Sequence, residues 1–419
     1  MTRRIKPEEP PMSVLGPSDE KSREVALLLH CAHSCLDTQH IQHIQTLLQE
    51  NLDWAYVTRM ALQHGVMPLL YWNLNKACPD SVPTDTFQQL RTNFFKISAR
   101  NLSLAGELLK ILHHLKTHGI PAIPFKGPTL AVSAYGNLSL RQFGDLDIFI
   151  PKQNLPCATE VLLSQGYQAR NQLNQEHPRD PLEEKYHTFV RKDGLVGIDL
   201  QWMIADSQFS FQLDHEDWQE RLAPVSLAGS SILSFPPEVM LLILCVHGSK
   251  HRWTRLQWVC DVAELLRAHP GMDWENVVGL ASRLGGQRML ALGILLAHDL
   301  LGTILSEEEL KRLTQDKVAV ALVRELKPQL FLSGEDIHKS GDPSAFYLKL
   351  RERWWDKAKY AMYLCEKRKP VAKKQDSSPL PVSLKYLYYL LWPFLQAGKY
   401  GLRSQKIKKA LSQWLESMG

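Results

Sequence analysis

Asp145 and Asp147 stand at the start of a short apolar run that ends before Pro151. Side chains alternate between the two faces of a strand, so a strand here places both carboxylates on one face and Leu146 on the other. Two carboxylates this close repel each other, and a cation between them relieves the repulsion. Hard cations such as Mg²⁺ take oxygen ligands and leave room for phosphate oxygens. The pair therefore predicts a cation site at one end of a strand.

The residues before this strand carry a second signal. The apolar run 120–125 predicts a strand, Lys126-Gly127-Pro128 predicts a turn, and residues 129–135 predict a short helix. Backbone N–H groups at a turn between a strand and a helix can receive a phosphate group. Arg141 stands four residues before the first aspartate and brings positive charge to the same stretch.

A third carboxylate, Asp199, lies in the strand-like run 197–202. An earlier strand-like run, 186–192, and the turn Asp193-Gly194 predict that the two runs form a hairpin. If this hairpin lies beside the strand of Asp145, Asp199 approaches the same cation. The order of strands and helices favours a small mixed sheet with helices on one side.

These residues together resemble the nucleotidyltransferase superfamily that includes DNA polymerase β and kanamycin nucleotidyltransferase. Within it, residues 100–265 are similar to the family called uncharacterised nucleotidyltransferases. The shared features are a Lys-Gly turn, an arginine before two aspartates, and a third aspartate followed by a tryptophan, here Lys126-Gly127, Arg141, Asp145 with Asp147, and Asp199 with Trp202. Two positions depart from the family pattern. Pro128 replaces the usual serine and donates no N–H, and Gln201 stands where histidine is frequent.

The resemblance implies Mg²⁺-dependent transfer of a nucleoside monophosphate from an NTP to an acceptor hydroxyl. Asp145, Asp147 and Asp199 would be the catalytic and metal-binding residues, with Asp199 binding a second cation or acting as the base. Lys126, Gly127 and Arg141 would contact the phosphates. For Arg141 the alternative is a salt bridge that only holds the aspartates.

A dense group of basic residues, 247–255, lies between two apolar helical patterns, 239–246 and 256–269. It is either a solvated connection between helices or, as the family resemblance implies, part of a helical domain that closes over the nucleotide. On the second interpretation His247, Lys250 and Arg255 bind nucleotide or acceptor.

The acceptor itself is open: a small molecule, a sugar or a peptide. The same motif order also resembles abortive-infection toxin nucleotidyltransferases, which act on RNA or nucleotides, and a non-catalytic nucleotide-binding module is a third alternative. The net charge of +5 is unevenly spread, because residues 366–419 hold eleven Lys and Arg against three acids, which leaves 5 − 8 = −3 for the rest. An acidic body argues against a large RNA substrate, since phosphate contacts dominate RNA affinity.

These patterns together predict an α+β protein, with a small mixed-sheet nucleotidyltransferase domain between N-terminal and C-terminal helical regions. The predicted parts are a disordered segment 1–20, helices in 21–118, the catalytic domain 119–232, a helical domain 233–366, and a basic tail 367–419 with an apolar helix. The long helical pattern 84–118 has an apolar stripe of Leu102, Ala105, Leu109, Leu112 and Leu115.

No apolar run is long enough to span a bilayer, and the N-terminal residues lack the apolar core of a signal peptide. The seven cysteines are scattered and include no C-x-x-C pair, which argues against a zinc site or a disulfide framework. We therefore expect a cytoplasmic protein, in which the tail either docks on the body or contacts a membrane surface.

Overall fold

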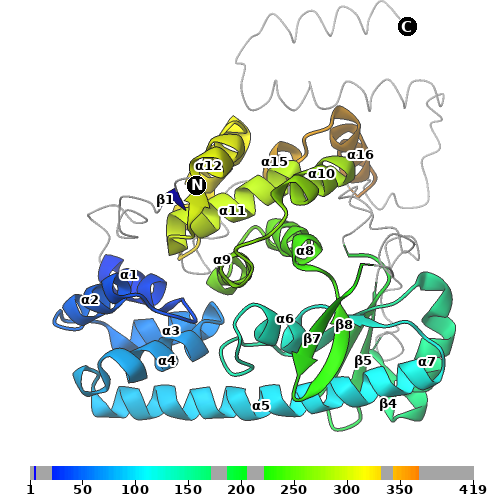
Figure 1. Cartoon of the computed structure of the whole chain (residues 1–419), viewed down its shortest axis with the longest axis horizontal. Helices are drawn as coiled ribbons and strands as arrows, with labels where there is room; N and C mark the ends of the chain where they lie inside the picture. The colour runs from blue at the N-terminus through cyan, green and yellow to red at the C-terminus, as the bar shows by residue number, and fades with distance from the viewer. Residues whose placement is uncertain (1–3, 6–20, 171–185, 205–220, 332–342, 368–419) are drawn as a thin grey trace, which may run out of the picture. The chain divides into compact units, whose positions relative to one another are not determined.

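The structure, a computed structural model, describes residues 4–5, 21–170, 186–204, 221–331 and 343–367 (Figure 1). The chain forms two compact units, residues 1–350 and 351–419. The described part of the second unit contains α16 (Trp354–Lys367). The predicted basic tail beyond residue 367 and most of the predicted disordered segment 1–20 lie outside the described residues. The predicted domain boundaries stay predictions.

Four helices open the first unit, and their starts follow from the local sequence. They are α1 (Ser22–Cys31), α2 (Thr38–Leu47), α3 (Trp54–Gln63) and α4 (Met67–Ala77). Asp37 and Asp53 cap α2 and α3, because each side chain accepts a hydrogen bond from a first-turn N–H. A short 3₁₀ turn, η2 (Pro79–Ser81), leads on to the next helix. The two-residue strand β1 (Arg4–Ile5) pairs with β9 (Leu305–Ser306).

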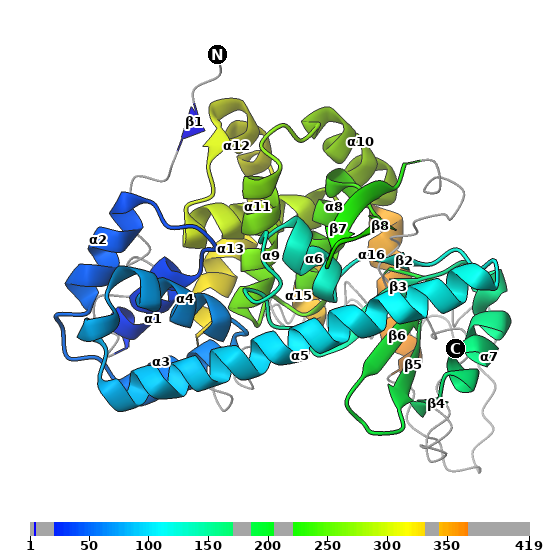
Figure 2. The ribbon, with the colours of Figure 1, turned by 60° about the horizontal axis from the view of Figure 1, so that its bottom comes forward.

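The long helix α5 (Thr84–Thr117) extends from these helices to the sheet (Figure 2). Gly119 ends it with a φ of +69°. The predicted apolar stripe is partly wrong, since Leu102 is 62% exposed. The buried face instead includes Asn101, Leu104, Ala105, Leu108, Ile111 and Leu115. This face winds between two partners, α4 at one end and the sheet at the other, so no single straight stripe describes it.

The central sheet is small and mixed, as predicted. Its strands are β2 (Ile123–Pro124), β3 (Asp145–Phe149), β4 (Tyr167–Ala169), β5 (Tyr186–Arg191) and β6 (Gly197–Gln201). Their order is β2-β3-β6-β5-β4, with β3 and β6 parallel and the other neighbours antiparallel. Strands β5 and β6 form the predicted hairpin.

One face of the sheet is apolar and the other polar. The apolar face packs against α5 and against α7 (Leu155–Ser164), which follows the short 3₁₀ turn η3 (Lys152–Asn154). Its buried side chains are Leu146, Ile148, Phe189, Ile198 and Leu200. The alternation of strand side chains therefore sends Asp145, Asp147 and Asp199 to the opposite face.

A second hairpin, β7 (Ala223–Leu227) and β8 (Ser230–Ser234), was not predicted. Its turn residues Ala228 and Gly229 both have positive φ, 48° and 83°, as tight two-residue hairpins require. Ser234 Oγ donates a hydrogen bond to the Pro124 carbonyl, which attaches the hairpin to β2.

Helices form the rest of the first unit: α6 (Gly127–Ser133), α8 (Pro237–Lys250), α9 (Leu256–Ala268), α10 (Trp274–Leu284), α11 (Gln287–Leu301), α12 (Glu307–Thr314), α13 (Lys317–Gln329) and α15 (Pro343–Leu350). Helix α10 ends before α11 begins because Gly285 takes a left-handed conformation. In the part of the chain that the structure describes, no helix is long and apolar enough to cross a membrane.

Candidate active site

The three predicted carboxylates lie together on the polar face of the sheet. In the parallel pair β3–β6, Asp147 is in register with Asp199 and Asp145 with Gly197. Residues in register on neighbouring strands point to the same face. Gly197 adds no side chain beside Asp145, so the space between that carboxylate and its neighbours stays open.

Each carboxylate has a different set of partners. Thr188 Oγ1 donates a 2.7 Å hydrogen bond to Asp199 Oδ1, across the β5–β6 pair. Gln201 Nε2 donates to Asp147 Oδ1. The Asp145 carboxylate accepts no hydrogen bond from any described residue, so it is the one most available to a ligand. In the sequence Gln201 stood out only as a departure from the family pattern, whereas in the structure it is the residue that orients Asp147.

Negative charge accumulates at this strand end. Loss of solvent around Asp145, and then the charges of Asp147 and Asp199, raise the pKa of Asp145 to about 6. Loss of solvent also raises the pKa of Asp199, against the hydrogen bond from Thr188, which lowers it. Because the neighbouring carboxylates contribute to both shifts, a cation between them would relieve part of this repulsion.

Lys126 brings positive charge to Asp147. Its Nζ lies 3.5 Å from Asp147 Oδ1 and 3.3 Å from His247 Nδ1. Because an ammonium group only donates hydrogen bonds, His247 must accept at Nδ1 and is therefore neutral. Consistently, loss of solvent and the positive charge of Lys126 lower the pKa of His247. His247, on α8, thus holds the lysine in place beside the carboxylates.

Gly127 is required by the backbone at the start of α6. Its φ is +51°, and a Cβ at this position would lie 3.2 Å from the Asp145 carbonyl oxygen. Any larger residue would push β3 away from the turn. Pro128 follows in the first turn of the helix. Backbone N–H groups in that turn have no partner within the helix, so the missing N–H of proline costs no hydrogen bond there.

Arg141 is held by a buried partner that was not predicted from the sequence. Its Nε and Nη2 donate to the two carboxylate oxygens of Asp261 on α9, at 2.7 and 2.9 Å. Tyr135 Oη, at the end of the α6 segment, donates to the same carboxylate at 2.7 Å. The negative charge of Asp261 raises the pKa of Arg141 despite burial. The predicted role of Arg141 in nucleotide binding stays a prediction, and only its remaining nitrogen, Nη1, is left for it.

The loop that carries Arg141 is fixed from two sides. Asn101 of α5 donates to the carbonyls of Leu138 and Arg141, each at 2.8 Å. Gln257 of α9 donates to the carbonyl of Gln142. The loop therefore enters β3 in a set conformation, which places the two aspartates.

The basic residues after His247 separate in the structure. The positive charge of Lys250 acts on His247, so this lysine lies near the site. The Arg255 guanidinium lies 5.9 Å from the centre of the Trp258 ring, and that ring is in edge contact with His247. Arg252 instead donates to Gln329 and lies over Phe346, toward α13 and α15.

The donor set suits a hard cation, because all the available ligands are carboxylate oxygens. Within residues 4–367, apart from the gaps given above, no three His, Cys, Asp or Glu side chains form a ready-made metal cage. Mg²⁺ seldom needs one, since it is usually held by one or two carboxylates together with phosphate oxygens of a substrate. The negative charge clustered around Asp145 fits a cation that arrives with such phosphates.

The chain matches the family model described as uncharacterised nucleotidyltransferase over residues 50–302. A comparison with curated proteins finds no significant match. Among solved structures, one match is the solution structure of the antibiotic-resistance factor ANT(2'')-Ia. This match has a TM-score of 0.31 and 14% sequence identity, and it covers 43% of this chain and 90% of that one.

Proposed function

Because this chain belongs to the family of uncharacterised nucleotidyltransferases, we propose that it transfers a nucleoside monophosphate from an NTP to the hydroxyl of a small-molecule, sugar or peptide acceptor. One observation carries this proposal. Asp147 and Asp199 stand in register on neighbouring parallel strands, with Asp145 two residues earlier on the same face. This arrangement concentrates carboxylates where a metal-bound triphosphate and a hydroxyl can meet.

In the proposed reaction the acceptor oxygen attacks the α-phosphorus of the NTP. A new P–O bond forms, the bond between the α-phosphorus and its bridging oxygen to the β-phosphorus breaks, and pyrophosphate leaves. Asp199 takes the proton of the attacking hydroxyl, and its raised pKa makes it a stronger base than an ordinary aspartate. The hydrogen bond from Thr188 occupies Oδ1 and leaves Oδ2 for that proton.

Asp145 and Asp147 would hold Mg²⁺, with Asp199 beside them, and the cation would supply charge neutralisation for the phosphates. Lys126 adds a point charge at the same place, which stabilises charge that grows on the leaving pyrophosphate. Neutral His247 fixes the lysine without adding a charge of its own.

Pyrophosphate release from each of the four common NTPs tests the proposal, with purified protein, Mg²⁺ and a cell extract as the source of acceptor. Asp147→Asn keeps the size of the side chain but removes its charge, and should lower turnover by roughly 10²–10³-fold or more. Asp80→Asn is the matched control, because Asp80 is exposed on the short turn after α4. Equal activity in wild type and Asp147→Asn, or NTP binding without any release, would refute the transfer reaction and favour a binding module.

A further inference from the structure

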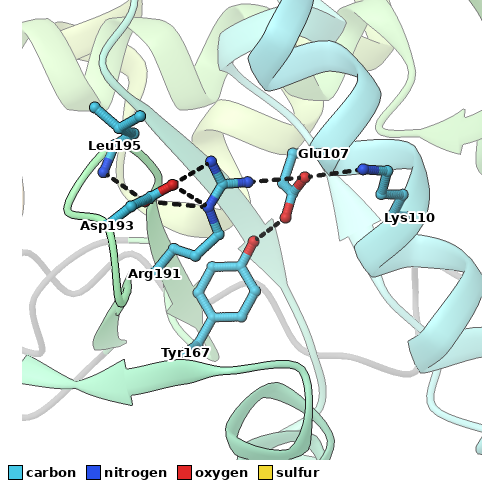
Figure 3. A network of polar contacts seen from close by, with 6 residues as sticks. All are labelled: Glu107, Lys110, Tyr167, Arg191, Asp193 and Leu195. Atoms are coloured by element: carbon cyan, nitrogen blue, oxygen red, sulfur yellow. Dashed lines mark hydrogen bonds and ion pairs between the residues drawn. The ribbon is translucent and has the colours of Figure 1, made fainter.

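The outer strands β4 and β5 have a helix-facing side that is fixed by a polar network (Figure 3). Glu107 of α5 accepts a 2.7 Å hydrogen bond from Tyr167 Oη and pairs with Arg191 at 3.1 Å. Arg191 also pairs with Asp193 in the hairpin turn. Because Tyr167 and Arg191 face α5, strand alternation sends Gln168 of β4 to the face that carries the catalytic carboxylates. Arg170 follows the last residue of β4, at the start of a 3₁₀ turn.

Strand register places the end of β4 near the carboxylates. Asp147 of β3 is opposite Asp199 of β6, Asp199 is opposite Thr188 of β5, and Ala169 of β4 is opposite Phe189. Arg170 directly follows Ala169, the last residue of β4, and begins a 3₁₀ turn there. Neighbouring strands lie about 4.8 Å apart, so the Arg170 backbone is roughly 10 Å from that of Asp199, within reach of an arginine side chain. The positive charge of Arg170 opposes the rise in the pKa of Asp199, which agrees with this placement.

Arg170 differs from the other cations around the carboxylates. Lys126 lies between Asp147 and His247, and Arg141 is paired with Asp261. Arg170 is exposed, and it makes neither an ion pair nor a hydrogen bond with any residue that the structure describes. Its charge stands on the far side of Asp199 from Lys126. An arginine guanidinium that pairs with no carboxylate among the described residues, beside a proton-accepting aspartate, is suited to bind an anionic group.

We propose that Arg170 binds a phosphate or carboxylate group of the acceptor and so selects acceptors that carry such a group close to the reacting hydroxyl. This inference rests on the proposed transfer reaction, because it assigns the side of the site beyond Asp199 to the acceptor. The NTP then occupies the side of Lys126 and His247. The two substrates would meet above Asp199, with the hydroxyl next to the carboxylate that takes its proton.

Three small probes share a hydroxyl-bearing frame and differ in the group that Arg170 would bind: glycerol 3-phosphate, glycerate and glycerol. Binding of each is measured by calorimetry to the full chain in the presence of Mg²⁺ and a non-hydrolysable NTP analogue. We expect at least one anionic probe to bind at least 10-fold more tightly than glycerol. Arg170→Gln should remove about 10-fold or more of that affinity, as expected for loss of a charge-assisted contact, and Arg170→Lys should retain part of it. The stronger of the two anionic probes identifies the group.

Lys192→Gln is the matched control. It also removes one exposed charge from the sheet, but Lys192 lies in the hairpin turn, roughly 13 Å along the strand from Thr188. Equal affinity for all three probes, or unchanged affinity in Arg170→Gln, would overturn the assignment. Loss of analogue binding in Arg170→Gln would also overturn it, by moving Arg170 to the NTP. Failure of the wild type to bind any NTP analogue would instead refute the transfer reaction. In that case, probe binding that depends on Arg170 without the analogue would still support an anion site at Arg170.

Discussion

His64 shows how one neutral side chain can fix the start of a helix far away in sequence. Its Nδ1 accepts a hydrogen bond from the backbone N–H of Leu256, the first residue of α9, while the Gln257 N–H binds the His64 carbonyl. The ring is fully buried. Loss of solvent, and then the charge of Arg255, lower the pKa of His64 to about 4. A protonated ring could not accept the Leu256 hydrogen bond.

This pKa predicts a loss of stability in acid. From pH 6.5 down to about 4 the unfolded chain binds the proton and the folded chain does not, so stability falls as the pH falls through this window, by up to about 3 kcal/mol. His64→Asn keeps an acceptor but cannot be protonated. Urea unfolding at pH 7.5, 6 and 4.5 should therefore show a smaller pH dependence for the variant. If the unfolding free energy of the wild type and of the variant changes equally with pH, His64 is excluded as the cause of the loss of stability in acid.

At the residue level the three carboxylates were predictable from the sequence. The side chains that hold Lys126 and Arg141 beside them were not. Strand alternation, which is local, places Asp145 and Asp147 on one face, and Asp199 joins them through the register of β6 with β3. Lys126 meets His247, and Arg141 meets Asp261, across 121 and 120 residues. Such pairs depend on how helices pack against the sheet, and no spacing in the sequence gives their partners.

The helices α8 and α11 approach closely because glycines face a buried tryptophan. A Cβ on Gly248 would lie 2.5 Å from the Trp253 ring, and a Cβ on Gly293 would lie 2.6 Å from Cys245 Sγ. Trp253 itself has a φ of +53°, directly after Arg252 at +54°. Burial of the indole compensates for two adjacent left-handed residues.

Two glycine substitutions should therefore change stability in opposite directions. Gly248→Ala overfills the space around Trp253 and should destabilise the protein by about 1–3 kcal/mol. Gly106→Ala is the matched control on α5, where a Cβ meets no atom within 4 Å. It should stabilise by roughly 0.5–1 kcal/mol through helix propensity. Thermal unfolding of both variants measures this, and a stable Gly248→Ala variant would show that the helices can move apart at little cost.

Among the elements, strong periodicity predicted most helices, and the β5–β6 hairpin was evident from its Asp-Gly turn. The β7–β8 hairpin was missed because its turn, Ala228-Gly229, puts alanine where asparagine or aspartate is usual. The stripe on α5 was misplaced because that helix serves two cores. A periodicity averaged over the whole helix cannot show a buried face that changes partner.

At the scale of the first unit, α9 connects the parts that surround the site. Asp261 binds Arg141 and Tyr135 beside the sheet. Three residues later, Glu264 accepts hydrogen bonds from the backbone and side chain of Ser34, at 3.0 and 2.6 Å, next to the N-terminal helices. Breaking a buried ion pair such as Arg141–Asp261 costs about 3–5 kcal/mol, and a hydrogen bond to a charged group such as Glu264 contributes about 1.5–3 kcal/mol. The sheet and the N-terminal helices therefore each lose a stabilising polar contact if they separate from α9.

This connection predicts that nucleotide binding stabilises the first unit as a whole. Mg²⁺ and a binding NTP at 100 times its dissociation constant add about 2.7 kcal/mol, which should raise the melting temperature by roughly 4 °C for a unit of this size. Because α9 couples the sheet to the N-terminal helices, one cooperative transition should move, with amide exchange slowing in α1 as well as in β3. Asp147→Asn should abolish the shift and Asp80→Asn should keep it. If only the sheet is stabilised and α1 unfolds at its original temperature, the stabilisation gained at the carboxylates ends at α9. That result would show that the Asp261 and Glu264 contacts do not couple the sheet to the N-terminal helices.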